Sequence, residues 1–146
     1  MVLVEATPQN GGAGFFHEYN TNGNLIREEI YNSAYEPGGY NEYTYDTTGA
    51  ISVCNTYNSD GKLEKRSEYR YDSAGALEMI VDYNSKHVRQ GWHEYVYDSM
   101  GRQIEVIDHI NEKKIGWKTV TEYDSYGRLF RNTGYDGKNK VTGWVE

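Results

Sequence analysis

The chain has little of what builds an ordinary globular core. Leu, Ile, Val and Phe account for only 26 of its 146 residues, and the net charge is −7. Such a composition is typical of chains that bury too little apolar surface to fold. Fifteen Tyr and three Trp reverse this expectation, because each ring offers a large apolar face with a polar edge. Such rings suit half-buried strands, so we expect an ordered but thin protein.

Cysteine and basic residues are also scarce. Cys54 is the only cysteine, which excludes an intramolecular disulfide and leaves the redox compartment open. Asp and Glu exceed Lys and Arg by 22 to 15, which argues against a nucleic acid partner. No apolar run approaches a membrane span, and the sequence does not begin with the basic and apolar stretches of a secretory signal.

Motifs for catalysis and metal binding are missing as well. The sequence has no G-x-S-x-G, H-E-x-x-H, C-x-x-C or phosphate-binding glycine loop. Its four histidines are scattered, and N-S-D-G-K at 58–62 lacks the oxygen ligands of a calcium loop. A nucleophilic Cys54 would need a neighbouring base, and a mid-strand position favours simple packing. We therefore expect no enzymatic activity, no metal and no cofactor.

What the chain does have is a repeat with a period of 26 residues. A tyrosine, followed by Asp or Asn, two variable residues and a glycine, occurs five times without a spacing error. The five tyrosines are Tyr19, Tyr45, Tyr71, Tyr97 and Tyr123. A repeat of this length indicates a supersecondary unit that buries its apolar face only by stacking on its neighbours.

The spacing inside each repeat predicts two strands. Two positions after the glycine the residue is usually apolar, and eight positions after it an aromatic ring usually returns, with His109 in place of a tyrosine in one copy. Even offsets place these side chains on one face of an extended strand. We therefore predict an all-β, antiparallel β-hairpin repeat sheet of about eleven strands between Phe15 and Val145, either single-layered or curled like a solenoid.

The turns are predicted from the same motif. Asp at the start of a tight turn and Gly three residues later fit a type I turn with a G1 bulge, in which the Asp side chain caps backbone amides. This structural role explains the motif carboxylates without a ligand; they are Asp46, Asp72, Asp98 and Asp124. Residues 57–61 repeat this pattern. The other second turns, at 32–39, 84–91, 110–116 and 136–143, look longer and less regular.

The domain boundaries follow from the repeat. Residues 1–13, with Pro8 and the pair Gly11 and Gly12, are predicted to form a flexible N-terminal leader. Residues 14–146 are predicted to form the repeat domain, with five repeats and a closing strand.

A second recurring element is a glycine followed by an aromatic residue at the start of a strand. The aromatic members are Phe15, Tyr40, Trp92, Trp117 and Trp144. If they share one face, rings on every second strand recur at roughly 10 Å, a spacing that suits stacking on alternate sugar rings of a glycan. The same rings also have a simpler interpretation as packing residues between neighbouring repeats.

The pattern Y-D-x-x-G-R at 97–102 and 123–128, with an upstream glycine, resembles the YD repeat of the bacterial Rhs family. The resemblance covers residues 14–146; Arg102 and Arg128 match the family arginine, whereas Asn24, Ala50 and Ala76 depart from it. It implies β-hairpin repeats that spiral into a sheet or shell. In large members such shells enclose toxin domains or act at cell surfaces, and carbohydrate binding is attributed to the repeats. The resemblance would also imply a location at the cell surface or outside the cell.

Three functions fit these observations. The first is a non-enzymatic structural or protein-interaction module that engages a protein partner, or a second copy, through its sheet edges or a face. The second is a carbohydrate-binding module that uses the aromatic column. The third is a small acidic protein that neutralises a basic toxin.

Overall fold

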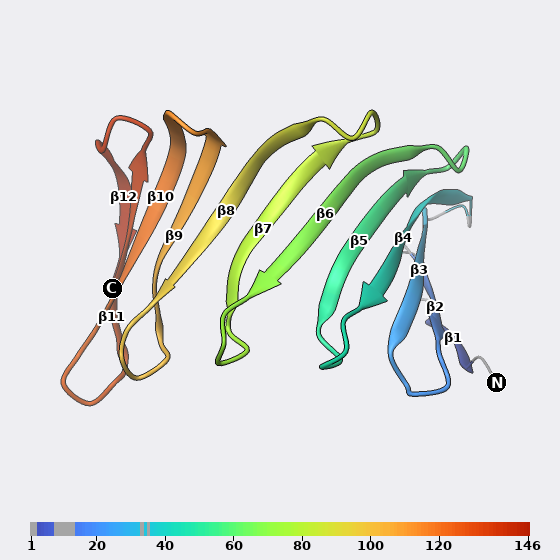
Figure 1. The fold of residues 1–146 in the computed structure, drawn as a ribbon, viewed down its shortest axis with the longest axis horizontal. Coiled ribbons are helices and arrows are strands. Elements are labelled where there is room, and N and C mark those ends of the chain that lie inside the picture. Colours follow the sequence, from blue (N-terminus) through green and yellow to red (C-terminus); the bar gives the residue numbers. More distant parts are fainter. Residues whose placement is uncertain (1–2, 8–13, 33, 35) are drawn as a thin grey trace. The chain divides into compact units, whose positions relative to one another are not determined.

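The computed structural model describes residues 3–7, 14–32, 34 and 36–146. Within them the chain is all-β, with no helix that could cross a membrane. The twelve strands, drawn in Figure 1, are β1 Leu3–Thr7, β2 Gly14–Tyr19, β3 Leu25–Tyr31, β4 Pro37–Tyr45, β5 Ile51–Asn58, β6 Leu63–Tyr71, β7 Leu77–Asn84, β8 Arg89–Tyr97, β9 Gln103–Asn111, β10 Lys114–Tyr123, β11 Leu129–Asp136 and β12 Val141–Val145. Their order in the sheet is their order in the chain, so the sheet is open and β1 and β12 are its edge strands.

The predicted fold class is confirmed. Strands β2 to β12 are the eleven strands expected between Phe15 and Val145, and the pairings described between them are antiparallel. The predicted leader needs a correction at residues 3–7, which form β1 and pair with β2 from Leu3 opposite Tyr19 to Thr7 opposite Phe15. The physical reason is that β2 would otherwise expose a row of backbone N–H and C=O groups. Residues 8–13 lie outside the described residues.

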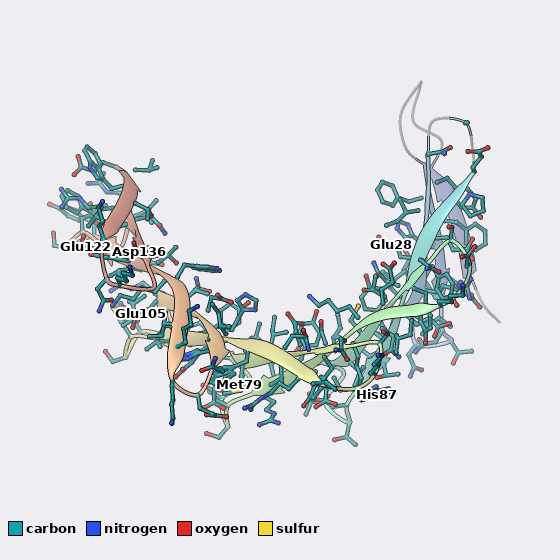
Figure 2. The ribbon with its side chains drawn as sticks, turned by 90° about the horizontal axis from the view of Figure 1, so that it is seen from above. Glu28, Met79, His87, Glu105, Glu122 and Asp136 are labelled. Atoms are coloured by element: carbon teal, nitrogen blue, oxygen red, sulfur yellow. The ribbon has the colours of Figure 1, made fainter. Side chains whose placement is uncertain are left out.

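The chain divides into two compact units, which we describe separately. One comprises residues 1–68 with 83–88, and the other comprises residues 69–82 with 89–146. In the described residues the only buried apolar side chain is Val81, at 2% exposure, and the buried polar residues are Ser67, Thr121 and Thr133. Side chains stand on both faces of the ribbon (Figure 2). Each unit is therefore stabilised by cross-strand side-chain pairs on a single layer of sheet.

The turns form as the repeat motif predicts. In each motif turn the amide of the glycine donates to the carbonyl of the Asp or Asn three residues earlier, for example Gly49 to Asp46 at 3.2 Å and Gly101 to Asp98 at 3.0 Å. The glycine has a positive φ, such as 89° at Gly49, which a residue with a Cβ rarely adopts. The motif thus requires glycine at this position because other residues rarely adopt a positive φ.

The second turns are shorter and more regular than the sequence suggested. The connections span only residues 32–36, 85–88, 112–113 and 137–140, because the flanking strands extend further into the predicted loops. They use the same capping: the amides of Lys86 and Val88, for example, donate to Asn84 Oδ1 at 2.9 and 3.0 Å. His87 and Asn139 occupy the left-handed position with φ near 60°, and the equivalent residue 26 positions before His87 is Gly61.

A tyrosine hydroxyl bond, which we call the tyrosine latch, connects consecutive repeats. The hydroxyl of the motif tyrosine donates to a backbone carbonyl 20 residues earlier, on the neighbouring strand. The pairs are Tyr45 to Leu25 at 2.6 Å, Tyr97 to Leu77 at 2.9 Å and Tyr123 to Gln103 at 2.9 Å. Each acceptor is the residue two positions after the previous motif glycine. The latch gives the tyrosine of the motif a structural role.

Candidate interaction surfaces

The predicted aromatic column is wrong in its geometry, because the strand register places its members on different faces. In the first unit, Phe15 lies opposite Ile30, which lies opposite Gly39. Tyr40 follows Gly39 directly and therefore projects from the other face, because directly opposed residues share a face and consecutive residues alternate.

In the second unit Trp117 lies on one face, and Trp92 and Trp144 lie on the other. Trp92 lies opposite His109, whereas Trp117 lies opposite Asp108, which puts the two rings on opposite faces. Trp144 lies opposite Thr133, which lies opposite Val120, and Val120 faces away from Trp117. Trp117 is 25 residues after Trp92, and β-bulges near Ile115 absorb the missing residue, so the side chain changes face. The predicted residues therefore do not form one column of rings.

The column residues differ in exposure and in what covers them. Trp92 stacks on the His109 ring at 4.5 Å with an interplanar angle of 5°, and the Arg89 guanidinium lies 4.8 Å from its ring. Tyr40 stacks in the same manner on Tyr57 at 4.6 Å. Trp117 and Trp144 are instead 40% and 63% exposed. The structure thus gives packing partners to Trp92 and Tyr40 and leaves two tryptophans accessible.

A cross-strand pair recurs at one position of the repeat. In three copies the ring eight residues after the motif glycine faces either another ring or a cation on the preceding strand, whereas Tyr31 of the first copy lies opposite Gly14. The pairs are Tyr40 with Tyr57, Trp92 with His109, and Lys118 with Tyr135, the last at 5.3 Å. His109, which the sequence placed at a tyrosine position, also bonds to Glu94 at 3.0 Å, as Tyr83 bonds to Glu68 at 3.3 Å. The prediction that His109 fills a tyrosine position is confirmed.

The motif carboxylates act as turn caps. Asp46 Oδ1 accepts from the amides of Thr48 and Ala50 at 2.8 and 3.0 Å, and Asp98 Oδ1 accepts from Met100 and Arg102 at 2.9 and 3.0 Å. The second oxygen of Asp98 accepts from the Arg102 guanidinium at 2.7 Å, which explains the arginine after the glycine. Bonds from the Arg102 amide and side chain hold the pKa of Asp98 below its ordinary value.

A polar cluster covers one face of the first unit around Glu28. Its carboxylate is 3.1 Å from His17 Nε2 and accepts from Asn41 and the Tyr43 hydroxyl at 3.4 Å each. Burial, followed by the Glu28 charge, raises the pKa of Tyr43 strongly. On the other face, Glu29 accepts from the Tyr31 hydroxyl at 2.6 Å and from Arg27, and these bonds lower its pKa. The Glu28 cluster therefore joins β3 to its neighbours β2 and β4, whereas Glu29 is held by Arg27 and Tyr31 of its own strand.

The described residues contain no group of three or more His, Cys, Asp or Glu side chains arranged to hold a metal ion. Cys54 is half-buried, opposite Tyr43 and Ser67 on the neighbouring strands.

Six of the exposed large apolar side chains lie in and just before the last two strands, which we call the C-terminal edge (β11 and β12), whereas Val88 and Met100 are exposed in turns elsewhere. The six are Tyr126, Leu129, Phe130, Val141, Trp144 and Val145, with exposed fractions between 50% and 84%. A pocket of about 440 Å³ is lined there by Glu122, Arg131, Thr133, Tyr135, Val141 and Trp144. The Arg131 guanidinium lies 5.8 Å from the Trp144 ring and pairs with Glu146. Of these residues only Trp144 was a candidate site residue from the sequence. Leu129 and Tyr135 occupy repeat positions, two and eight residues after Gly127, and their place at the end of the sheet order comes from the structure.

Comparison with known proteins gives a likeness in fold. No protein-family model and no curated protein matches the chain. The crystal structure of TcdB2-TccC3 matches with a TM-score of 0.54 and 15% identity over 92% of this chain, which spans 9% of that chain. A porin-like protein from Bacteroides uniformis matches with a TM-score of 0.40 at 10% identity, over 91% of this chain and 88% of that one. A protein of unknown function from Bacteroides fragilis matches with a TM-score of 0.32 at 15% identity, over 99% of this chain and 91% of that one.

Proposed function

We propose that the chain is a non-enzymatic, YD-type repeat module that binds a protein partner through its C-terminal edge. The observation that carries this proposal is β12, whose five residues are all exposed and which stands at the end of the sheet order. An edge strand offers a row of backbone donors and acceptors that a partner strand can pair with. The likeness in fold to TcdB2-TccC3, over 92% of this chain, supports a repeat module and is compatible with an interaction role.

The side chains of the C-terminal edge support the same proposal. Soluble proteins usually protect an edge strand with charged residues, proline or a bulge. The sequence of β12, V-T-G-W-V, has neither charge nor proline, although its pairing with β11 is irregular between Gly134 and Tyr135. Trp144 and the flanking Arg131 belong to the residue types that dominate the binding energy of protein interfaces. The mixture of an exposed aromatic ring, exposed aliphatic side chains and a few charges is typical of an interface.

The experiment that tests the proposal is site-specific photocrosslinking in the cells that make the protein. A photoreactive amino acid at Val145 should give discrete adducts on irradiation, whereas the same group at Ser73, in an exposed turn before β7, should give none. The masses of the adducts identify the class of partner. Equal, diffuse labelling from both positions, or none from either, would contradict an edge-specific interaction.

A second candidate is carbohydrate binding, favoured by the pocket beside Trp144 rather than by an aromatic column. Trp144, Tyr135 and Arg131 line that pocket together with Glu122, so an aromatic face and polar groups stand together as in sugar sites. Titration with soluble polysaccharides, followed by the fluorescence of Trp144, tests this alternative. A saturable shift that Trp144→Ala abolishes would favour it over the protein-interaction proposal.

A further inference from the structure

We propose that a pocket in the second unit, at the motif turn before β7, binds the guanidinium group of an arginine side chain carried by a partner protein. The pocket has a volume of about 280 Å³, and residues of that turn, of β7 and of β8 line it. They are Asp72, Glu78, Glu94, Tyr95, Val96 and Tyr97. Three carboxylates and two phenol rings suit a cation with a planar face. The pocket is separate from the C-terminal edge, because β9 and β10 lie between them in the sheet order.

The repeat that follows holds a guanidinium between the same two kinds of side chain. Arg102 Nε donates to Asp98 Oδ2 at 2.7 Å, and the guanidinium carbon lies 4.5 Å from the centre of the Tyr123 ring. The residues 26 positions earlier are Asp72, Ala76 and Tyr97. The carboxylate and the motif tyrosine are thus repeated, whereas alanine replaces the arginine. The pocket therefore corresponds to the place that the motif arginine fills in the next repeat.

The carboxylate of Asp72 is held in its turn but is not covered. Its Oδ1 accepts from the amides of Ala74 and Ala76 at 2.8 and 2.9 Å, as Asp98 Oδ1 accepts from the amides of its own turn. Asp98, which also bonds to Arg102, is half-buried, whereas Asp72 is exposed. Because Ala76 has no guanidinium to offer, the second oxygen of Asp72 can accept one from another molecule.

Two further carboxylates make the pocket more acidic than its counterpart in the next repeat. Glu78 and Glu94 line the pocket, and the residues 26 positions later are the apolar Ile104 and Val120. Glu78 is exposed, and Glu94 is 3.0 Å from His109 Nε2. A cation that enters the pocket therefore meets more negative charge than the motif arginine of the next repeat does.

The chemistry of the pocket favours arginine over other cations. A guanidinium can bond to a carboxylate through two N–H groups and can stack its flat face on a tyrosine ring, whereas the ammonium of lysine is a point charge. The pocket carboxylates repel the α-carboxylate of free arginine. An arginine within a peptide, whose flanking amides are neutral, therefore fits better than the free amino acid.

Titration with N-acetyl-arginine amide, followed by NMR of the backbone amides, tests the site. We expect saturable shifts at residues 72–76 with a dissociation constant in the millimolar range, and at least about threefold weaker binding of N-acetyl-lysine amide and of free arginine. Asp72→Asn keeps the turn cap, as Asn84 does, and should weaken binding at least about threefold. Asp98→Asn is the matched control and should change it less than about twofold, because Arg102 already fills that place.

Two results of this titration would overturn the proposal. Equal binding of free arginine and of N-acetyl-arginine amide would contradict a ligand carried by a protein. Shifts of equal size at the other motif turns, unaffected by Asp72→Asn, would show that the cation binds acidic turns without distinction and that the pocket is not a site.

Filling the pocket from within provides an independent test. Ala76→Arg restores the motif arginine, which should contact Asp72 and Tyr97 as Arg102 contacts its own partners. This variant should melt at a higher temperature and should not bind N-acetyl-arginine amide, whereas Ala76→Gln, which is uncharged, should do neither. Binding that persists in a folded Ala76→Arg variant would overturn the proposal, and if that variant does not fold, the Asp72→Asn titration decides. None of these variants changes β11 or β12, so the outcome leaves the proposed function at the C-terminal edge unaffected.

Discussion

The hydroxyl of Tyr97 donates a 2.9 Å hydrogen bond to the backbone carbonyl of Leu77, 20 residues earlier. The same bond joins Tyr45 to Leu25 and Tyr123 to Gln103. Because the acceptor lies in the preceding repeat, each latch couples one hairpin to the next. The tyrosine of the 26-residue motif therefore contributes its hydroxyl to the structure as well as its ring.

Tyr97→Phe should destabilise the protein by about 1 kcal/mol, because it removes the latch bond and keeps the ring. Tyr126→Phe is a matched control, since that side chain is 84% exposed, and its effect should lie within about 0.5 kcal/mol. Urea unfolding followed by circular dichroism measures both. Equal losses of stability in the two variants would contradict a structural role for the latch.

Acid should weaken the turns capped by aspartate. Bonds from backbone amides and Arg102 lower the pKa of Asp98, and similar bonds lower that of Asp124. A carboxyl whose folded pKa is depressed contributes stability above its unfolded pKa, near 3.8, and loses it as the pH falls through the folded value.

The melting temperature should therefore drop below about pH 4, and less so in a variant with Asp98→Asn and Asp124→Asn. Asparagine keeps an accepting oxygen and does not titrate, and the turns at Asn58 and Asn84 already use it. Thermal melts from pH 7 to pH 2 measure the difference. An identical acid dependence in the variant would show that these carboxylates do not govern it.

His87→Gly should stabilise the protein by about 0.5–1 kcal/mol, because His87 holds a φ of 59° that glycine adopts without a steric cost. Its neighbour Lys86 provides the control: Lys86→Gly adds unfolded-state entropy without relieving a positive φ and should destabilise. Chemical denaturation of the two variants gives the comparison. A loss of stability in His87→Gly would contradict the left-handed turn.

His109→Tyr should be tolerated within about 0.5 kcal/mol, whereas His109→Ala should cost about 1 kcal/mol or more, since it removes the ring stacked on Trp92. The reason is that Tyr57 already makes the same stack with Tyr40. Tryptophan emission and denaturant midpoints report the outcome. If His109→Tyr were as unstable as His109→Ala, positions 57 and 109 of the repeat would not be structurally equivalent.

The sequence predicted the hairpins well because their determinants are local. An Asp or Asn cap and a glycine three residues later set each motif turn, and the alternation of side chains sets the strands. Residues 3–7 were misassigned because their pairing with β2 depends on a neighbouring edge rather than on a repeat signal.

The candidate site was harder to predict because it depends on register. Trp92 and Trp117 look equivalent, since each follows a glycine, yet one missing residue and the bulges near Ile115 turn them to opposite faces. The position of Trp144 at an uncovered edge follows from the strand order, which only the structure supplies. A comparison of the tryptophan spacings with the 26-residue period would have revealed the change of face.

The most direct test of the interaction role is acrylamide quenching of Trp144 alone, in a variant with Trp92→Phe and Trp117→Phe. We predict that emission of the protein alone is readily quenched, that quenching falls when the partner identified by photocrosslinking is added, and that soluble polysaccharides change nothing. Protection of Trp144 by a polysaccharide, with no response to protein, would contradict the account and favour a glycan-binding module.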